Sequence, residues 1–179
     1  MKSIQVRDKK FDIYLTKEKI QETVKAVAEM MIPDLHDKNP LFVIVLNGAY
    51  VFAADLIRHF EFDCEIAFIR LSSYQGMQST RKVKEIMGLT QDVTARNVVL
   101  IEDIIDTGTT MTYAKKRFKE KGAADVKLAA FLFKPNAFEE NYTIDYIGME
   151  IPDDFIVGYG LDYDECGRSY PDIYVVNSK

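Results

Sequence analysis

Residues 98–112 read VVLIEDIIDTGTTMT, and this stretch decides the fold. The aliphatic run Val98 to Ile101 predicts a short strand that is buried on both faces, as the strands of parallel sheets are. Glu102 and Asp103 follow directly, and a third carboxylate comes at Asp106. We expect these acidic residues to form a turn at the end of the strand. A helical pattern downstream completes a strand–loop–helix unit of an α/β sheet.

A loop joins this strand to a helix that is expected over 113–121. Its composition is typical of a phosphate-binding turn. Thr107 to Thr110 offer hydroxyl and backbone N–H donors, and Gly108 has no Cβ to block a close ligand. The helix N-terminus adds partial positive charge at the same point. Neighbouring carboxylates suit sugar hydroxyls or hydrated Mg²⁺. The stretch therefore predicts a site for a phosphorylated ribose, although its spacing alone also fits a helix cap with solvated acids.

The segment EDIIDTGTT at 102–110 resembles the phosphoribosyl-pyrophosphate (PRPP) signature of type I phosphoribosyltransferases, and its flanks are similar to the hypoxanthine-guanine branch. The resemblance extends from about residue 10 to the C-terminus. It implies an α/β fold with a mostly parallel central sheet flanked by helices, a small hood and a mobile lid loop. It also implies a glycosyltransferase of purine salvage, which transfers 5-phosphoribosyl from PRPP to hypoxanthine or guanine and yields IMP or GMP with pyrophosphate.

The resemblance assigns roles within the signature itself. The ribose and its 5′-phosphate are bound by Glu102, Asp103, Thr107, Gly108, Thr109 and Thr110. Glu102 and Asp103 also hold the Mg²⁺ cofactor. Asp106 lies between the acidic pair and the phosphate loop, within reach of the purine N7, and is the candidate catalytic acid or base. Whether Asp106 transfers a proton or only accepts a hydrogen bond stays open at this point.

A second strand–loop–helix unit is predicted upstream, with a buried strand over Leu41 to Leu46 and a helix over 51–60. Asn47 and Gly48 join them, and spacing alone also fits a plain Asn-Gly turn. The resemblance places this loop against pyrophosphate and implies a non-proline cis peptide within it. Because many members have Lys where this chain has Asn47, contacts through the backbone N–H groups are expected instead.

A polar stretch follows the third predicted strand, 62–72. It opens with Ser73 and Tyr74 and continues to about Lys84. It is long for a connection within a domain, which favours a lid or a linker. The lid is the better interpretation because Val83 to Leu89 returns to strand-like residues. The resemblance implies that the hydroxyls of Ser73 and Tyr74 close over pyrophosphate.

The remaining assignments lie beyond the next predicted strand, 126–133. Lys134 follows that strand, where a lysine is either solvated or a donor to a ligand carbonyl. The resemblance places it on the six-position oxygen of a 6-oxopurine base. The tail reads PDDFIVGYGLDYDECGR over 152–168. By resemblance, Phe155 stacks on the purine, Ile156 contacts its edge through the backbone, Asp162 holds a second Mg²⁺ and Arg168 binds pyrophosphate.

The bulk composition limits the other classes of function. The chain has 179 residues, 47% hydrophobic and 28% charged, with a net charge of −5, so general binding to nucleic acid or to an anionic membrane is disfavoured. Two cysteines without a C-x-x-C pattern and two histidines argue against a transition-metal site. No signal peptide or membrane span is predicted, so a cytoplasmic location is expected.

The whole chain, 1–179, is predicted to be a single domain. Its lid is expected at about 73–84, and its hood at about 151–170 together with the N-terminal segment. A helix is predicted from a cap at Thr16 to Pro33. The resemblance suggests a homodimer or homotetramer. Two rival functions remain: a PRPP-sensing regulator that binds RNA or DNA, and a transferase for another base such as xanthine.

Overall fold

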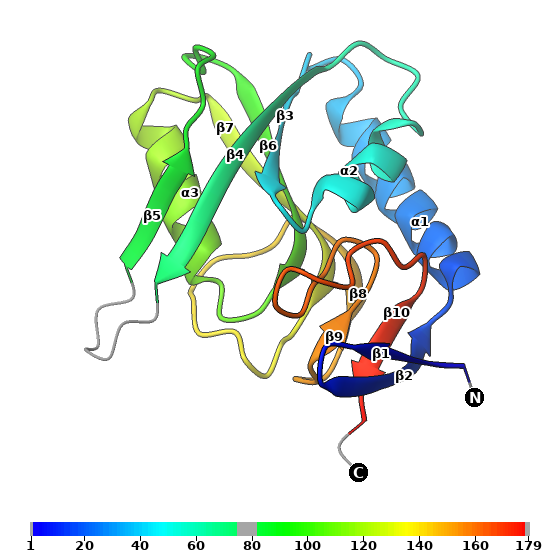
Figure 1. Ribbon diagram of the computed structural model, residues 1–179. Helices are drawn as coiled ribbons and strands as arrows, with labels where there is room; N and C mark the ends of the chain where they lie inside the picture. The colour runs from blue at the N-terminus through cyan, green and yellow to red at the C-terminus, as the bar shows by residue number, and fades with distance from the viewer. Residues whose placement is uncertain (1, 75–81, 178–179) are drawn as a thin grey trace.

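The computed structural model describes residues 2–74 and 82–177, and its chain folds into two sheets and three helices within those ranges (Figure 1). The elements are β1 Ser3–Val6, β2 Lys9–Leu15, α1 Lys17–Leu35, β3 Leu41–Leu46, α2 Tyr50–Ile57, β4 Glu65–Tyr74, β5 Lys82–Met87, β6 Asn97–Ile105, α3 Thr109–Glu120, β7 Asp125–Phe133, β8 Tyr146–Glu150, β9 Ile156–Val157 and β10 Ile173–Val176. None of the described helices is long and apolar enough to span a membrane.

The larger sheet has the strand order β5-β4-β3-β6-β7-β8. Its neighbouring strands are parallel except for the edge pair β4 and β5, which is antiparallel. Between β3 and β6 the order in which the chain adds strands reverses: β4 lies on the far side of β3, and β7 and β8 lie on the far side of β6. In open α/β sheets, ligands bind beyond the carboxyl ends of strands at this reversal. The predicted mostly parallel sheet is confirmed.

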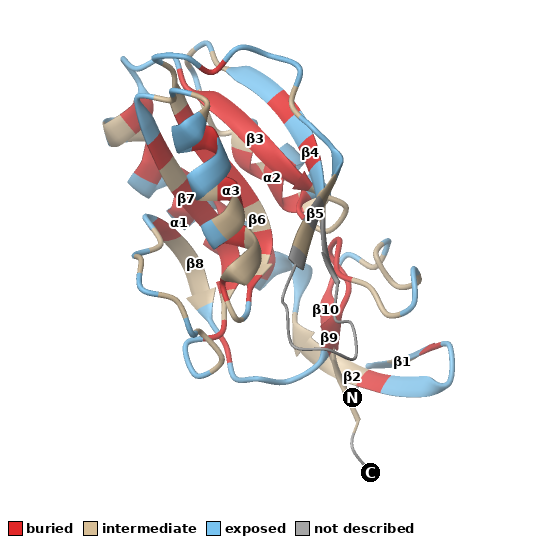
Figure 2. Cartoon of the chain, turned by 90° about the vertical axis from the view of Figure 1, so that its left-hand side faces the viewer, coloured by how far each residue is buried: buried red, intermediate tan, exposed pale blue. Residues whose placement is uncertain are grey.

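Helices cover the two faces of this sheet unequally. α1 and α2 pack on one face and α3 on the other, so that the sheet separates two apolar cores. β3 lies between them and is buried almost throughout, whereas β4 alternates between buried and exposed residues (Figure 2). Because the face that carries α1 and α2 has no helix over the β4–β5 edge, apolar side chains there stay exposed.

The first helix is close to its prediction at one end and differs at the other. Thr16 is the N-cap, and its side-chain oxygen accepts a hydrogen bond from the Lys19 N–H at 3.4 Å. The helix does not end at Pro33 but continues to Leu35. A proline in the last turn removes one backbone hydrogen bond, and buried packing of Met31 and Leu35 outweighs that loss.

The smaller sheet has the order β1-β2-β10-β9 and is antiparallel. It joins the N-terminal hairpin to strands from the C-terminal quarter of the chain, and Figure 1 shows it below the carboxyl end of the larger sheet. Phe11, Val157 and Tyr174 fill its own apolar core. The sheet is called the hood below. β1 and β2 form a local hairpin, but the pairing of β2 with β10 joins the two ends of the chain, so no local pattern in the sequence specified it.

The expected lid, 73–84, falls largely outside the described residues, because 75–81 are not described. On either side, Ser73 and Tyr74 end β4, and Lys82 begins β5 opposite Tyr74. Residues 73, 74 and 82–84 therefore belong to a paired hairpin and not to a loop. The third strand begins at Glu65 and not at 62, and runs two residues further than predicted.

Candidate functional site

The acidic pair lies inside β6, and the prediction of an acidic turn is wrong. β6 continues to Ile105 because it stays paired with β7, with Glu102 beside Ala130 and Ile105 beside Phe133. Its pairing with β3 stops earlier, at Ile101. The end of β6 is thus open on the β3 side, where Asp103 is 7% exposed and its Oδ1 accepts the Ile104 N–H at 3.0 Å.

Glu102 and Asp103 each change the pKa of the other. Burial raises the pKa of Glu102 well above its usual range, and the negative charge of Asp103 raises it further. Burial also raises the pKa of Asp103, while a hydrogen bond from Glu102 and the Ile104 N–H partly oppose that rise. Two acids held in this way favour a partner that donates hydrogen bonds or carries positive charge.

The phosphate loop is shorter than predicted, because α3 begins at Thr109. Gly108 is the N-cap residue with a φ of 85°, a left-handed conformation that favours glycine. Thr109 and Thr110 therefore occupy the first turn of α3, and the Oγ1 atoms of Thr107 and Thr109 lie 3.3 Å apart. Backbone N–H groups at a helix start have no partner within the helix and suit an anion.

The Asn47-Gly48 loop packs directly against the acidic pair. The peptide bond between Leu46 and Asn47 is cis, as the family resemblance implied. A Cβ added to Gly48 would lie 1.6 Å from the Asp103 Oδ2, so only glycine fits beside that carboxylate. A Cβ added to Gly160 would lie 2.1 Å from the Gly48 oxygen. Three segments distant in the sequence therefore meet beside β3 and β6, where the order of the strands in the sheet reverses.

Arg168 joins this cluster from the hood side of the chain. Its Nη1 donates to the Gly160 oxygen at 2.8 Å, and its Nη2 lies 2.7 Å from the Asp162 Oδ1. The charge of Arg168 lowers the pKa of Asp103, in opposition to the effect of burial, so the two side chains interact electrostatically. The structure thus brings the predicted residues Gly48, Asp103, Asp162 and Arg168 together.

Lys134 and Asp106 form a second pair at the same sheet edge. Lys134 follows β7, its N–H donates to the Ile105 oxygen at 2.9 Å, and its side chain is 11% exposed. Its Nζ lies 3.8 Å from the Asp106 Oδ2, while the Asp106 side chain is 53% exposed. The solvated interpretation of Lys134 is therefore excluded. A buried ammonium next to an accessible carboxylate presents one donor and one acceptor to a ligand.

Phe155 and Ile156 lie in the hood. Ile156 is buried in β9, whereas Phe155 is 43% exposed. The Phe155 ring meets Tyr163 edge-on with centroids 5.6 Å apart, and Phe11 at 6.2 Å. Phe155 is thus held by aromatic neighbours and keeps an open side, in contrast to a core phenylalanine. Among the described residues, its ring–ring contacts are with Phe11 of β2 and with Tyr163.

The connection between β7 and β8 also contacts the phosphate loop, which no sequence motif predicted. The Glu139 N–H donates to the Thr107 oxygen at 3.2 Å, and the Tyr142 hydroxyl donates to the Gly108 oxygen at 2.9 Å. No motif marked this segment, because its contacts with the phosphate loop span more than 30 residues of chain. The side chains of Ser73 and Tyr74 lie outside what the structure describes.

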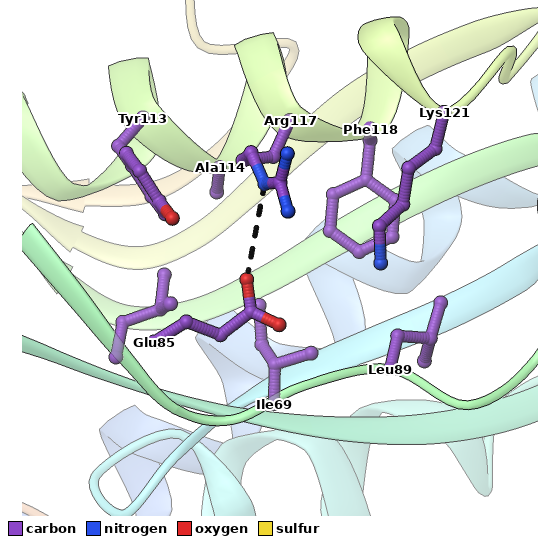
Figure 3. Close-up of a pocket in the computed structure, with 9 residues that line it drawn as sticks. Ile69, Glu85, Leu89, Tyr113, Ala114, Arg117, Phe118 and Lys121 are labelled. Atoms are coloured by element: carbon purple, nitrogen blue, oxygen red, sulfur yellow. Dashed lines mark ion pairs between the residues drawn. The ribbon is translucent and has the colours of Figure 1, made fainter.

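A separate hollow of about 290 Å³, counted with the open space at its mouth, lies between α3 and the β4–β5 hairpin (Figure 3). Apolar side chains line it, and Arg117 faces Glu85 across it with Nε and Oε2 4.0 Å apart. None of the predicted site residues lines this hollow. It therefore belongs to the packing of α3 against the hairpin and not to the ligand site.

A threonine-rich loop at the N-terminus of α3, and an acidic pair beside the point where the strand order reverses, are the features expected of a phosphoribosyltransferase. The chain belongs to the phosphoribosyl transferase family, whose domain pattern matches residues 11–164. A hypoxanthine-guanine phosphoribosyltransferase of Aquifex aeolicus is 36% identical over 96% of this chain and 98% of its own length. One of Bacillus subtilis is 38% identical over 92% of both chains.

Solved structures agree with this result. A crystal structure of a hypoxanthine-guanine phosphoribosyltransferase from Bacillus anthracis, with a HEPES molecule in the active site, is 39% identical to this chain. It superimposes with a TM-score of 0.88 over 93% of this chain and 98% of that one. The family resemblance drawn from residues 102–110 is thereby confirmed, and so is the fold class.

Proposed function

We propose that this phosphoribosyltransferase acts in purine salvage, transferring the 5-phosphoribosyl group of PRPP to hypoxanthine or guanine. One observation carries the choice of base: a buried Lys134 whose Nζ lies 3.8 Å from the Asp106 carboxylate. An ammonium donates to the six-position oxygen of a 6-oxopurine and repels the amino group that adenine presents there. Asp106 then accepts from the N7 side of the same base. The names of the relatives support this choice.

Glu102 and Asp103 accept hydrogen bonds from the ribose hydroxyls, and residues 107–110 bind the 5′-phosphate. The carboxylates also stabilise the positive charge that develops on the ribose as the bond to pyrophosphate breaks. Fixing the sugar at two points orients its anomeric carbon toward the base. This arrangement draws its support from the position of Asp103 at the sheet reversal and of Gly108 at the α3 N-terminus.

Pyrophosphate is held by Arg168, by the backbone N–H groups of Asn47 and Gly48, and by Ser73 and Tyr74 of the hairpin. Arg168 is 21% exposed, and its planar guanidinium suits phosphate oxygens. The contact between Asp162 and Arg168 orients the guanidinium before the substrate enters.

The residues present fit Mg²⁺, the cofactor we propose. Glu102, Asp103 and Asp162 offer the hard oxygen donors that Mg²⁺ prefers. Within the described ranges, no group of three or more ligating side chains forms a ready cage. Mg²⁺ in phosphate-transferring sites is commonly held by one or two carboxylates together with substrate phosphates. When bound, Mg²⁺ neutralises the charge on the leaving pyrophosphate.

The purine lies between Lys134 and the open side of Phe155, with the backbone of Ile156 at its edge. Asp106 bonds the N7 position, where the base must lose its proton as the new glycosidic bond forms. General acid–base groups of this kind contribute about 100- to 10,000-fold to a rate. We expect Asp106→Asn to lower kcat by at least about 100-fold while PRPP still binds. A near-normal kcat in that variant contradicts the assignment.

Competition among hypoxanthine, guanine, xanthine and adenine tests the substrate class. We expect turnover of hypoxanthine or guanine and none of adenine. Xanthine is the closest rival because Lys134 contacts its six-position oxygen equally well. Clear turnover of adenine excludes the proposed role of Lys134, and preference for xanthine reassigns the base. RNA binding that is tight and salt-sensitive, without turnover, points instead to a regulator.

We also propose that two copies of the chain pair through the uncovered β4–β5 face, here called the open face and defined by Tyr50, Ile66, Phe68 and Met87. These side chains are 44%, 40%, 47% and 41% exposed. Ile66 and Phe68 point to the same side of the sheet as α2, because they lie beside the buried β3 residues Phe42 and Ile44. Contiguous exposed apolar surface of this kind marks an interface.

The composition of α2 supports a second copy as the occupant. Its eight residues, YVFAADLI, include a single charged side chain, which is typical of a helix that is covered on most sides. The charges beside the open face also suit pairing of two identical copies. Asp63 precedes and Arg70 follows the apolar pair Ile66 and Phe68. A two-fold axis near Ile66 and Phe68 places Arg70 of one copy near Asp63 of the other.

Sedimentation equilibrium tests this pairing. We expect the wild-type chain to be a dimer or a tetramer built from two such dimers, and Phe68→Glu to lose this pairing. Met30→Glu is the matched control, since Met30 is 47% exposed on α1, outside the open face. A wild-type monomer, or equal dissociation of both variants, contradicts the proposal.

We further propose a cytoplasmic location. Cys64 and Cys166 are both free thiols, as suits a reducing compartment. Cell fractionation that follows PRPP-dependent activity tests this, and recovery outside the soluble cytoplasmic fraction contradicts it.

A further inference from the structure

The phosphate loop is held from behind by the connection between β7 and β8. Two consecutive carbonyl oxygens of the loop accept hydrogen bonds from this connection. The Thr107 oxygen accepts the Glu139 N–H at 3.2 Å, and the Gly108 oxygen accepts the Tyr142 hydroxyl at 2.9 Å. The Gly108 oxygen also accepts the Thr112 N–H at 3.0 Å, the first backbone bond of α3. Both carbonyls are therefore fixed on the side of the connection.

Fixing a carbonyl fixes the N–H of the same peptide unit. A trans peptide is planar, and its C=O and N–H point in opposite directions. The Thr107 oxygen thus sets the direction of the Gly108 N–H, and the Gly108 oxygen sets that of the Thr109 N–H. Both N–H groups point away from the connection. This geometry suits an anion, because a carbonyl turned toward a phosphate repels it.

Tyr142 is itself held firmly. Its ring meets Phe138 edge-on with centroids 5.2 Å apart, and the Lys115 Nζ lies 5.1 Å from the ring centroid on another side. Phe138 packs beneath the loop, since a Cβ added to Gly108 would lie 2.5 Å from its ring. Burial raises the pKa of the Tyr142 hydroxyl. The hydroxyl is therefore protonated, and a donor, throughout the physiological range.

We propose that Tyr142 is a positioning residue for the 5′-phosphate. It touches neither the sugar nor the base, and acts by fixing the Gly108–Thr109 peptide so that its N–H faces the phosphate. This inference rests on the proposed function for the identity of the ligand. It adds a residue far from the signature, contributed by a connection that the sequence pattern did not mark.

Tyr142→Phe tests the proposal because it keeps the ring and its packing and removes only the hydroxyl, which also bonds the Thr112 side chain. The Gly108 oxygen keeps the Thr112 N–H, so the loop loses orientation without leaving a buried carbonyl unpaired. We expect the Kd for ribose 5-phosphate, measured by calorimetry, and the KM for PRPP to rise about three- to ten-fold, the range that one neutral hydrogen bond is worth. We expect kcat, the KM for the base and the Kd for pyrophosphate to stay within about two-fold of wild type, because, within the described residues, the Tyr142 hydroxyl bonds only the phosphate loop and α3.

Tyr146→Phe is the matched control. The Tyr146 hydroxyl donates to the Asp34 carboxylate near the other end of the sheet, so its loss affects stability and not the phosphate loop. Weaker ribose 5-phosphate binding in Tyr142→Phe alone supports the proposal. Unchanged binding in Tyr142→Phe, or equal weakening in both variants, overturns it. If wild type fails to turn over PRPP and 6-oxopurine, the proposed function falls, while ribose 5-phosphate binding still decides the role of Tyr142.

Discussion

Gly48→Ala probes the close contact between the Asn47-Gly48 loop and Asp103. The added Cβ would lie 1.6 Å from the Asp103 Oδ2 and 2.5 Å from its Cγ. Ordinary contact begins near 3.4 Å, so the carboxylate oxygen must retreat by about 1.8 Å. Asp103 has little room to do so, since it is 7% exposed and its other oxygen is bonded to the Ile104 N–H.

Two effects follow from this clash. Overpacking of a buried site costs about 1–3 kcal/mol of unfolding free energy. For a chain of this size, that cost lowers Tm by roughly 2–12 °C. A displacement of about 1 Å in a site can reduce a rate by about 100-fold, so we expect kcat/KM for PRPP to fall by at least that factor. Thermal unfolding and initial-rate kinetics measure the two effects separately.

Gly88→Ala is the matched control. A Cβ at Gly88 would lie 2.1 Å from the Glu85 Oε1, the far end of a flexible side chain that is 28% exposed. That oxygen can rotate away, so stability and activity should change little. A near-normal Tm and kcat/KM in Gly48→Ala refute the reasoning.

Combining Gly48→Ala with Asp103→Ala identifies the source of the cost. The second substitution removes the obstructing carboxylate, so in that background Gly48→Ala should lose most of its effect on Tm. The expected coupling between the two substitutions is about 1–3 kcal/mol. Activity should stay low in the double variant, because the acid itself is missing. Full additivity of the two stability changes means that the strain lies elsewhere.

Three further predictions concern the base site and the scaffold. Lys134→Gln should raise the KM for hypoxanthine about ten-fold or more, since a hydrogen bond from a charged donor is worth about 1.5–3 kcal/mol; steady-state kinetics measure it. Phe155→Ala should raise the KM for the base with a smaller effect on PRPP, because a stacked ring contributes about 1–3 kcal/mol. Asp34→Asn should destabilise the fold by about 1–3 kcal/mol at pH 7, because Asp34 accepts from Lys127 and Tyr146. These donors lower the pKa of Asp34, so its stabilisation is present above about pH 4 and lost as the pH falls further; denaturant unfolding should show the variant and wild type converging in acid.

The parts of the fold that depend on local pattern were predictable. The buried run Leu41–Leu46 forms β3 with the predicted bounds, and Thr16 caps α1 as expected. The end of β6 was not predictable, because Glu102 and Asp103 are poor strand formers on their own. Pairing with β7 keeps them extended, and that pairing links positions 28 residues apart, Glu102 with Ala130.

The candidate site also has a part that could be predicted from the sequence and a part that could not. Residues of the signature, and Lys134 at the end of a buried strand, could be located because parallel strands end at one edge of a sheet. The contact of Gly160 with Gly48 and the hydrogen bond from Tyr142 to Gly108 could not be predicted, because no spacing of residues in the sequence indicates either of them. In both cases a glycine in the sequence indicated that another group comes close to the backbone, but it did not identify that group.

The sheet order explains why these distant segments must meet. Because β3 and β6 are neighbours while their helices α2 and α3 cover opposite faces, the two following loops separate at the carboxyl edge. A ligand there contacts the Asn47-Gly48 loop on one side and the phosphate loop on the other. In the proposed function, the hood adds Phe155 and Ile156 to the base contacts of Lys134 and Asp106. The hood is assembled from both ends of the chain, since β2 of the N-terminal hairpin pairs with β10, which also pairs with β9.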